Sequence, residues 1–219
     1  RGRYGRRHGH PGKKGRHRDN NLACATQRWN DFGLDVFTAD SDGPMFSRAQ
    51  AINRAAAKTD ADVLIVADND ILLDKPEQAV EAAELASEKG MYVVAFSELR
   101  VLDWDETLAV RDGADPLEQP VLEIIKLIWS NCFAVPRSLF NRVGGFDERF
   151  VGCGHQDGAF LNCCSTLAGK DRVFGVAFHL RHDPPDRSHP HMHDNAELAV
   201  RYRQADGNKK AMRTLMAER

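Results

Sequence analysis

The most constraining feature of the sequence is a short apolar run and the acidic turn that follows it. Val63–Ala67 is an unbroken run of apolar residues that ends abruptly at Asp68-Asn69-Asp70. A run of this length without alternation is typical of a strand buried on both faces in a parallel sheet. Open α/β sheets bind their ligands at the carboxyl ends of such strands, so we expect the two carboxylates to lie at a binding site.

Helical and strand patterns alternate along the chain after residue 19. Apolar residues at helical spacing predict helices over the segments 21–31, 44–58, 76–89, 136–143, 156–168, 195–204 and 209–217. Apolar runs predict strands over 34–38, 63–67, 91–96, 129–135 and 173–180. The polar segment 97–120 has a weak pattern, which indicates a long loop or a small insertion. Strands that alternate with helices in this way predict an α/β sandwich.

The chain of 219 residues has the composition of a folded protein. Hydrophobic residues make up 42% and charged residues 28%, which excludes a wholly disordered or collagen-like chain. No apolar run approaches the roughly 18 residues of a membrane-spanning helix, and no signal-peptide pattern is visible. The five cysteines are an odd number without a CxxC pair, which favours reduced thiols over disulfides or a zinc site. We therefore expect a cytoplasmic protein.

Positive charge is concentrated at the amino terminus. Residues 1–18 contain eight of the 30 Lys and Arg residues and no acid, so the remaining residues carry 22 basic against 32 acidic side chains. A basic segment rich in Gly and His is typical of a flexible arm that contacts a polyanion, or of a solvated tail. Phosphate contacts by such an arm would weaken steeply with salt.

Asp68-Asn69-Asp70 is the first candidate for chemistry. Carboxylate oxygens at a strand end suit Mg²⁺ or Mn²⁺, and such an ion can bridge to a diphosphate. The same three residues also form ordinary turns, so the motif by itself leaves both alternatives open.

A glycine-rich segment is the second candidate. Two glycines open the sequence Gly144–Phe150, and two more precede His155-Gln156-Asp157. Glycines at this density fit a loop whose backbone passes close to a ligand. Asp157, near an expected helix start, is placed either to act as a base or to cap the helix.

His179 and His182, at the end of an expected strand, are the third candidate. A neutral imidazole there would complete the coordination of an ion held by Asp70. An HxxH pair on a strand is also often incidental. A solvated loop explains three further histidines nearby, His189, His191 and His193.

Taken in order, these motifs resemble the GT-A class of glycosyltransferases, in particular the beta-galactosyltransferase carboxyl-domain type and its bacterial and bacteriophage relatives. Phe46-Ser47-Arg48-Ala49 with Asn53 is similar to the family's F-x-R-A-x-x-x-N helix, and Asp68-Asn69-Asp70 to its DxD motif. Gly144–Asp157 resembles the G-G-F-D…G-W-G-G-E-D segment, and His179 and His182 fall where the family supplies its remaining metal ligand. The resemblance spans residues 16–182 and implies a mixed, mostly parallel sheet with helices on both faces.

The resemblance implies a role for each matching residue. The metal ligands would be Asp70, His182 and His179. Contacts to the nucleotide diphosphate donor would come from Phe46, Arg48, Asn53, Asp68, Asn69, Arg16 and Arg18. The acceptor would contact Gly154, His155, Cys153 and Trp129, while the catalytic residues would be Asp157, as general base, and Gln156. The implied cofactor is Mn²⁺, or Mg²⁺ in its place, and the implied donor is a UDP-sugar.

Three departures from the family pattern bear on activity. The family's Trp in the glycine-rich segment is Cys153 here, which removes a surface on which an acceptor sugar stacks. The family's Glu is Gln156, so a neutral amide replaces one of two adjacent carboxylates. An opening strand that ends in P-[FY]-R-x-R is not visible, and Arg16 and Arg18 stand in for its arginines. Residues 1–18 are therefore a flexible arm or a remnant of that strand region, 19–193 the GT-A domain, and 194–219 a helical extension that packs on it.

The resemblance thus implies metal-dependent transfer of a sugar from a nucleotide diphosphate to an acceptor hydroxyl, with inversion at the anomeric carbon. A glycan, a protein or a modified DNA base is the expected acceptor. Two alternatives stay open. One is a degenerate protein of the same fold that binds a nucleotide or glycan without turnover, and the other is a nucleotidyltransferase, which shares the sheet and the metal carboxylates.

Overall fold

The computed structural model describes residues 16–152, 154–184 and 189–219, with side chains from residue 19 onward. The predicted basic arm over residues 1–18 lies outside the described residues, except that the backbone of the first helix begins at Arg16. No helix in the described ranges is both long and apolar enough to cross a membrane. The cysteines within these ranges are free thiols: Cys24, Cys132, Cys163 and Cys164.

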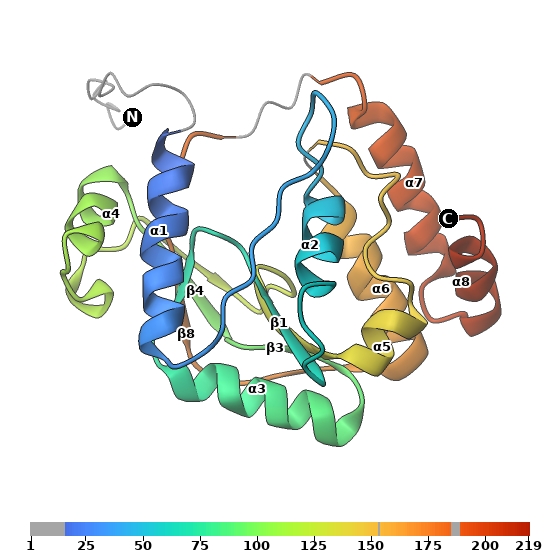
Figure 1. Cartoon of the computed structure of the whole chain (residues 1–219), viewed down its shortest axis with the longest axis horizontal. Coiled ribbons are helices and arrows are strands. Elements are labelled where there is room, and N and C mark those ends of the chain that lie inside the picture. The colour runs from blue at the N-terminus through green and yellow to red at the C-terminus, as the bar shows by residue number, and fades with distance from the viewer. Residues whose placement is uncertain (1–15, 153, 185–188) are drawn as a thin grey trace, which may run out of the picture.

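Two mixed four-stranded sheets form the centre of the fold (Figure 1). In spatial order the first contains β1 (Val63–Ala67), β6 (Cys132–Pro136), β3 (Tyr92–Val94) and β7 (Lys170–Arg172). The second contains β2 (Ile71–Leu73), β8 (Val176–His179), β4 (Glu98–Val101) and β5 (Glu123–Lys126). The short turn between β1 and β2 therefore joins the two sheets.

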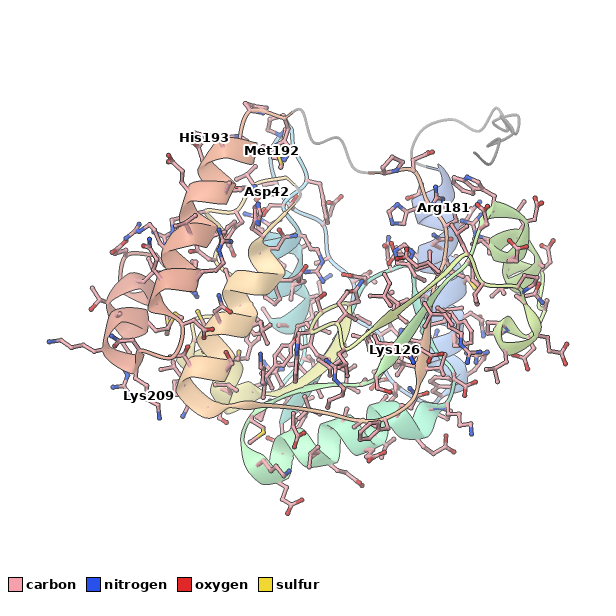
Figure 2. All side chains as sticks on the ribbon, turned by 180° about the vertical axis from the view of Figure 1, so that it is seen from behind. Asp42, Lys126, Arg181, Met192, His193 and Lys209 are labelled. Atoms are coloured by element: carbon pink, nitrogen blue, oxygen red, sulfur yellow. The ribbon has the colours of Figure 1, made fainter. Side chains whose placement is uncertain are left out.

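Helices flank these sheets. They are α1 (Arg16–Asp31), α2 (Arg48–Ala56), α3 (Pro76–Lys89), α4 (Trp104–Arg111), the 3₁₀ turn η1 (Pro116–Glu118), α5 (Arg137–Arg142), α6 (Gln156–Ala168), α7 (Met192–Ala205) and α8 (Lys209–Met216). The two carboxyl-terminal helices, α7 and α8, pack side by side against α6 (Figure 1, Figure 2). The mixed α/β architecture is confirmed.

The expectation of a mostly parallel sheet is wrong. Four of the six strand pairings among the described residues are antiparallel, and only β3–β7 and β4–β8 are parallel. Among the strands that the structure describes, β1 pairs with β6 alone, and its side chains alternate between buried and half-buried. An uninterrupted apolar run reports burial but not the direction of the neighbouring strand, which explains the error.

Several predicted elements differ from the observed ones. Residues 34–38 are extended but belong to no sheet, and the expected loop over 97–120 contains β4, α4 and η1. The strands β5 and β7 carry charged residues at an edge, so no apolar run marked them. Edge strands often carry such charges because these discourage pairing with other molecules.

Helix α3 shows how local chemistry sets an element's bounds. It begins at Pro76, whose fixed φ suits a first helical turn, and Gly90 ends it at a φ of 67°. The predicted bounds of 76–89 are confirmed. The buried residues Ala79, Ala82 and Ala86 recur at helical spacing, and their small side chains let α3 pack closely on β1, β3 and β6.

An aromatic stack joins the first sheet to the glycine-rich segment and α6. The ring centroids of Tyr92 and Phe133 lie 4.4 Å apart, and those of Phe146 and Phe160 lie 4.1 Å apart. Phe133 and Phe160 connect the two pairs at 5.8 Å. This buried stack fixes the segment after α5 and the start of α6 relative to the strand ends.

Candidate active site

The site forms where β1 ends and the chain crosses into the second sheet. The backbone N–H of Asp68 donates to the carbonyl of Asn131 at 2.8 Å, which extends the β1–β6 ladder by one pair. The N–H of Ile71 donates to the Asp68 carbonyl at 3.2 Å and closes the turn. The two carboxylates of this turn contact different elements: Asp68 contacts α2, and Asp70 contacts the chain after β8.

The structure brings Asp70, His179 and His182 together. β2 and β8 are antiparallel with Ile71 opposite His179, and the N–H of Leu180 donates to the Asp70 carbonyl at 2.8 Å. Asp70 Oδ2 lies 2.9 Å from His182 Nε2 and 3.9 Å from His179 Nε2. One ligand atom from each of the three residues lies within 4.8 Å of the others. The strand pairing itself therefore assembles a three-residue cluster that can hold a cation.

The proton arrangement of His182 fits a cation-binding role. His182 Nδ1 lies 2.7 Å from the carbonyl of Asp183, and it must donate there because a carbonyl only accepts. In a neutral imidazole the lone pair of Nε2 then faces the Asp70 carboxylate. A proton or a cation has to lie between these two groups, and a carbonyl that fixes the far nitrogen is a common outer-shell feature of metal-binding histidines.

The pKa shifts at this cluster agree with such a role. Burial opposes ionisation of Asp70, but the hydrogen bond with His182 and the charges of His179 and His182 outweigh it and hold the pKa of Asp70 below its ordinary value. Burial lowers the pKa of His179, against the opposing charge of Asp70. A charged carboxylate and a neutral imidazole are the protonation states in which both groups bind metals.

The donor set also distinguishes between cations. One carboxylate oxygen and two imidazole nitrogens suit Mn²⁺ better than Mg²⁺, which strongly prefers oxygen ligands. His179 Nδ1 is buried and accepts or donates no hydrogen bond among the described residues, so neither ring nitrogen of His179 is committed elsewhere. The residues present therefore fit a divalent transition-metal ion.

Arg48 forms the second half of the site. It opens α2, whose N-cap Ser47 accepts a hydrogen bond from the N–H of Gln50. Arg48 Nε donates to Asp68 Oδ1 at 2.8 Å, and its terminal nitrogens form ion pairs with Asp68 and Asp157. A single guanidinium thus joins the end of β1 to the first turn of α6.

Negative charge exceeds positive charge around Arg48. Burial raises the pKa of Asp68 to about 6; the charge of Arg48 opposes this shift, and those of Asp157 and Asp70 add to it. Burial disfavours the charged form of Arg48, but Asp68 and Asp157 outweigh it and raise the pKa of Arg48. Two carboxylates paired with one guanidinium, and the charge of Asp70 acting on Asp68, create a demand for further positive charge, which a bound cation would meet.

The glycine-rich segment places the first turn of α6 beside Arg48. Gly152, Gly154 and His155 all have positive φ values, 78°, 106° and 72°, so the chain turns sharply before the helix begins. His155 precedes α6, and Asp157 lies in its first turn. Asp157 Oδ1 contacts Arg48, while Oδ2 accepts no hydrogen bond from the described residues. The side-chain oxygen of Gln156 is buried and likewise has no described partner.

Close packing explains part of the glycine density. A Cβ atom on Gly145 would lie 2.5 Å from Oδ1 of Asn53, and one on Gly152 would lie 2.8 Å from both Met45 and His189. At these two positions the missing side chain makes room for protein atoms, whereas the sequence suggested room for a ligand.

Two asparagines hold this segment by reciprocal hydrogen bonds to its backbone. Asn53 accepts from the N–H of Phe146 at 2.8 Å and donates to its carbonyl at 2.9 Å. Asn195, on α7, accepts from the N–H of Val151 at 3.3 Å and donates to its carbonyl at 2.8 Å. The role of Asn53 as a nucleotide ligand stays a prediction, and its observed contacts are those of a residue that positions the segment.

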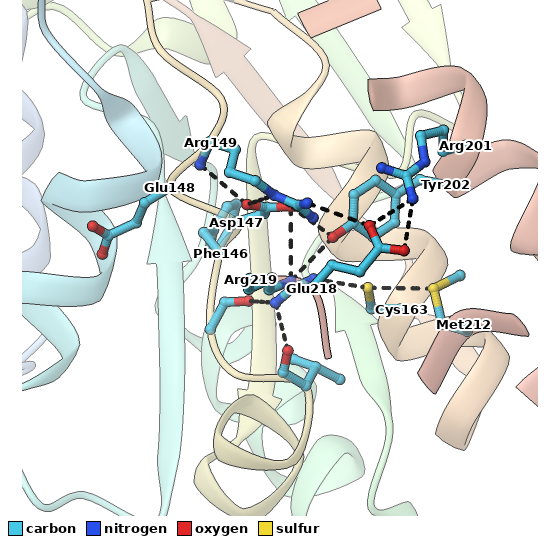
Figure 3. A network of polar contacts seen from close by, with 12 residues as sticks. Phe146, Asp147, Glu148, Arg149, Cys163, Arg201, Tyr202, Met212, Glu218 and Arg219 are labelled. Carbon is cyan, nitrogen blue, oxygen red and sulfur yellow. Dashed lines mark hydrogen bonds and ion pairs between the residues drawn. The ribbon is translucent and has the colours of Figure 1, made fainter. Parts of the chain in front are cut away.

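A buried polar network fixes the same segment from the carboxyl-terminal side (Figure 3). Asp147 is paired with Arg149 at 2.7 Å and accepts a hydrogen bond from the Tyr202 hydroxyl at 2.7 Å. Arg219 donates to that hydroxyl at 3.0 Å and to the carbonyls of Val143 and Gly145. The sequence reasoning missed Tyr202, Asn195 and Arg219, because no local pattern separates them from ordinary polar residues of an amphipathic helix.

The structure places the remaining predicted site residues as follows. Phe46 is half exposed, and its carbonyl accepts from the N–H of Gly152 at 3.1 Å. Asn69 is half-buried between the two carboxylates of the turn. The Trp129 ring is covered by the cations of Lys170 and Arg172, each 4.3 Å from its centroid. Cys153 and the side chains of Arg16 and Arg18 lie outside the described residues.

The comparisons with known proteins give similarity at the level of structure alone. No protein-family model and no curated protein sequence matches the chain, but 27 chains of solved structures match. One is the catalytic domain of Drosophila beta1,4galactosyltransferase 7 in complex with xylobiose, with 14% identity, 83% of this chain and 74% of that chain covered, and a TM-score of 0.44. Another is the mannosyltransferase PcManGT from Pyrobaculum calidifontis in complex with GDP-Man and Mn²⁺, with 14% identity, 76% and 44% covered, and a TM-score of 0.39. The chain thus spans less than half the length of this mannosyltransferase.

Proposed function

We propose that the chain is a metal-dependent glycosyltransferase of the GT-A kind, which transfers a sugar from a nucleotide diphosphate to an acceptor hydroxyl. The observation that carries the proposal is the convergence of Asp70, His179 and His182 beside the ion-paired centre of Arg48, Asp68 and Asp157. A cation cluster and a half-buried guanidinium next to each other suit the diphosphate leaving group of a sugar nucleotide.

The residues of the cluster would hold the cation, and Arg48 would bind the phosphates. A bound Mn²⁺ would act as a Lewis acid that neutralises charge on the leaving diphosphate. Arg48 donates from Nε to Asp68 and keeps its guanidinium oriented by stacking 5.8 Å from the Phe146 ring centroid. A fixed, desolvated guanidinium forms charge-assisted hydrogen bonds to phosphate oxygens at a small entropic cost.

Asp157 would act as the general base. Its Oδ1 is held by Arg48, which leaves Oδ2 to accept the proton of an acceptor hydroxyl. The buried side-chain oxygen of Gln156 would accept a hydrogen bond from the same substrate. Direct attack from this side of the anomeric carbon inverts its configuration. A general base typically contributes about 10²–10⁴-fold to the rate.

The donor, the acceptor and the cellular location are proposals as well. We favour a UDP-sugar as donor, with a glycan, a protein or a modified DNA base as acceptor, and a cytoplasmic location. Residues 1–18 would recruit an anionic acceptor through their Lys and Arg side chains. Contact through phosphates would weaken steeply as salt is raised.

A second candidate is a binding protein of the same fold without turnover. The observation in its favour is that Arg48 forms an ion pair with one oxygen of Asp157, the proposed base, while the neighbouring residue is the neutral Gln156. Slow release of nucleotide diphosphate from a sugar nucleotide separates the two candidates, because a binding protein would release none.

The decisive experiment is titration calorimetry of UDP with Mn²⁺ and with EDTA. We expect Mn²⁺-dependent binding that His182→Ala reduces at least tenfold, since each ligand lost weakens a metal site strongly. His193→Ala is the matched control: this histidine, near the start of α7 (Figure 2), is exposed and pairs with Glu197 on the same helix, outside the cluster. Binding that is unchanged by EDTA, or lost equally in both variants, would contradict the metal assignment. Release of pyrophosphate from a nucleoside triphosphate would instead indicate a nucleotidyltransferase.

A further inference from the structure

One face of the edge strand β7 and the residues after it carries two cations and an aromatic ring. Asp171 pairs with Lys89 of α3 at 2.8 Å, and a Cβ atom on Gly175 would meet the side chain of Gln78, also on α3. Val173, between them, is buried. The odd-numbered residues of this stretch therefore face α3. Because side chains alternate along a strand, the even-numbered ones face away from α3: Lys170, Arg172 and Phe174.

Phe174 is exposed to an unusual degree. Of the large apolar side chains that the structure describes, it is the most exposed, at 84%. Lys170 beside it is also exposed, and Arg172 is half-buried. Single apolar residues on a surface are common, but an aromatic ring in solvent on the same face as two cations combines the two kinds of contact that bind a charged ring compound.

Trp129 positions the two cations. Lys170 Nζ and Arg172 Cζ each lie 4.3 Å from the centroid of the Trp129 ring, so no more than twice this distance separates them. Arg172 also donates to the carbonyls of Phe96 at 2.7 Å and Ile128 at 2.6 Å. The ring and the two neutral carbonyls orient both charges without neutralising them.

These two positive charges lack an acidic partner. Within the part of the chain that the structure describes, no carboxylate forms an ion pair with Lys170 or Arg172, whereas Lys89 on α3 and Arg100 on β4 each pair with one at 2.8 Å. Burial lowers the pKa of Arg172, since it disfavours a charge that no acid offsets. An anion at this face would therefore meet two oriented cations that are free to bind it.

The face is connected to the candidate active site. The Tyr92 hydroxyl donates to the Trp129 carbonyl at 2.6 Å, and burial raises the pKa of Tyr92, with the charge of Asp157 adding to the shift. Two residues beyond Trp129, the Asn131 carbonyl accepts from the N–H of Asp68 at 2.8 Å. The chain over 129–131 thus leads from the cationic face to the turn that carries Asp68, and Asp157 lies near enough to act on the hydroxyl that holds it.

We propose that this face is a subsite for an anionic acceptor glycan. Lys170 and Arg172 pair with its carboxylate or sulfate groups, the apolar side of a sugar ring packs on Phe174, and Trp129 holds the cations in position. A single-stranded nucleic acid fits less well, because it stacks successive bases on several rings, and the Trp129 ring is already covered by the cations. The inference rests on the proposed function, since it assigns the acceptor class for the same site.

Titration calorimetry of the full chain without a sugar nucleotide tests the subsite by itself. The probes are tetragalacturonate, which carries carboxylates, a heparin tetrasaccharide, which adds sulfates, and cellotetraose as the uncharged control. We expect the charged probes to bind about tenfold more tightly than cellotetraose at low salt, and to lose affinity as salt is raised. Binding of one charged probe alone would support the proposal and identify the anion. Equal binding of cellotetraose, or no binding of either charged probe, would overturn it.

Variants of exposed side chains locate the binding without disturbing the core. Lys170→Gln and Phe174→Ser should each weaken binding of the charged probes about threefold to tenfold. Lys89→Gln is the matched control, because it removes a cation from the α3 side of the same strand, and it should leave binding unchanged. The Lys and Arg side chains of residues 1–18 are the same in all variants. Equal affinities throughout would therefore overturn the subsite and assign the binding elsewhere.

The remaining outcomes separate this inference from the proposed function. Charged probes that bind as expected in a chain without sugar transfer would support the subsite and count against the transferase. Binding of UDP with Mn²⁺ but of no glycan would overturn the subsite alone. An oligothymidylate of equal charge that binds more tightly than both glycans, and loses affinity in Phe174→Ser, would overturn the glycan assignment in favour of a nucleic acid.

Discussion

At the scale of single residues, charge balance governs the candidate site. Asp68 and Asp157 pair with the Arg48 guanidinium, while Asp70 pairs with His182, so each carboxylate has different neighbours. Asp70 faces two imidazoles, half-buried Asp68 pairs with Arg48, and no described residue donates a hydrogen bond to Oδ2 of Asp157. In the proposed mechanism the same chemical group would thus serve as a metal ligand, an orienting partner and a base according to its contacts.

Asp157→Asn tests the base. The amide keeps the shape of the side chain and an oxygen for Arg48, but it cannot take a proton. We expect kcat to fall by about 10²–10⁴-fold while calorimetry shows donor binding near the wild-type value. Turnover at the wild-type rate would remove Asp157 from the mechanism.

Asp68 predicts a pH dependence of stability. Its pKa in the folded protein is about 6, above the ordinary 3.8, so between these values the folded state holds a proton that the unfolded state has lost. Stability from this group is therefore present at low pH and declines as pH rises from about 4 to 6. In EDTA, the Tm of the wild type relative to Asp68→Asn should fall over this range. A relative Tm that rises would contradict the assignment, and Mn²⁺ should reduce the decline.

At the scale of elements, the active site depends on how the segment between α5 and α6 is held. The Phe146 ring packs in the aromatic stack, and Asn53 and Asn195 bond to the backbone from α2 and α7. These contacts come from helices on two sides and hold the segment in place. Because the segment leads into α6, its path determines the position of Asp157.

Asn195→Ala tests this bracing. The change leaves the N–H and C=O of Val151 without their partner, so we expect a loss of about 1–3 kcal/mol of unfolding free energy and a lower kcat. Asn208→Ala is the control, because it removes the N-cap of α8, a loss of about 1 kcal/mol, far from the site. Equal kcat values for the two variants would show that Asn195 is structural only.

At the scale of the whole molecule, the carboxyl-terminal helices complete the domain. Tyr202 on α7 and Arg219 after α8 reach the buried Asp147 and the carbonyls that precede it (Figure 3). Burial opposes ionisation of Asp147, but hydrogen bonds from Arg149 and Tyr202 hold its pKa below the ordinary value. The network therefore stabilises the fold at neutral pH and weakens as pH falls through that lowered pKa.

Tyr202→Phe tests the network because it removes the hydroxyl alone. Asp147 then loses a donor inside the protein, and we expect a loss of about 1–3 kcal/mol at pH 7, measured by urea unfolding. The difference from the wild type should shrink at low pH, where Asp147 is protonated in both proteins. A difference that does not change with pH would mean that the hydroxyl acts through packing rather than through Asp147.

The sequence by itself determined the helices and strands whose bounds depend on residues only a few positions apart. The Val63–Ala67 run, the Pro76 start and Gly90 end of α3, and the bounds of α6 all follow from such signals. The ordered motifs also predict Asp70, His179 and His182 as partners, and the structure brings these three residues together.

Only the tertiary structure decided how these pieces meet. Strand direction and the ion pairs of Arg48 depend on contacts between residues far apart in the chain. An apolar run has the same composition beside a parallel or an antiparallel neighbour, and an asparagine on a helix has the same local pattern whether or not it holds a loop. The physical reason is that register and long-range hydrogen bonds are set by the packing of the whole domain, which no short window of sequence contains.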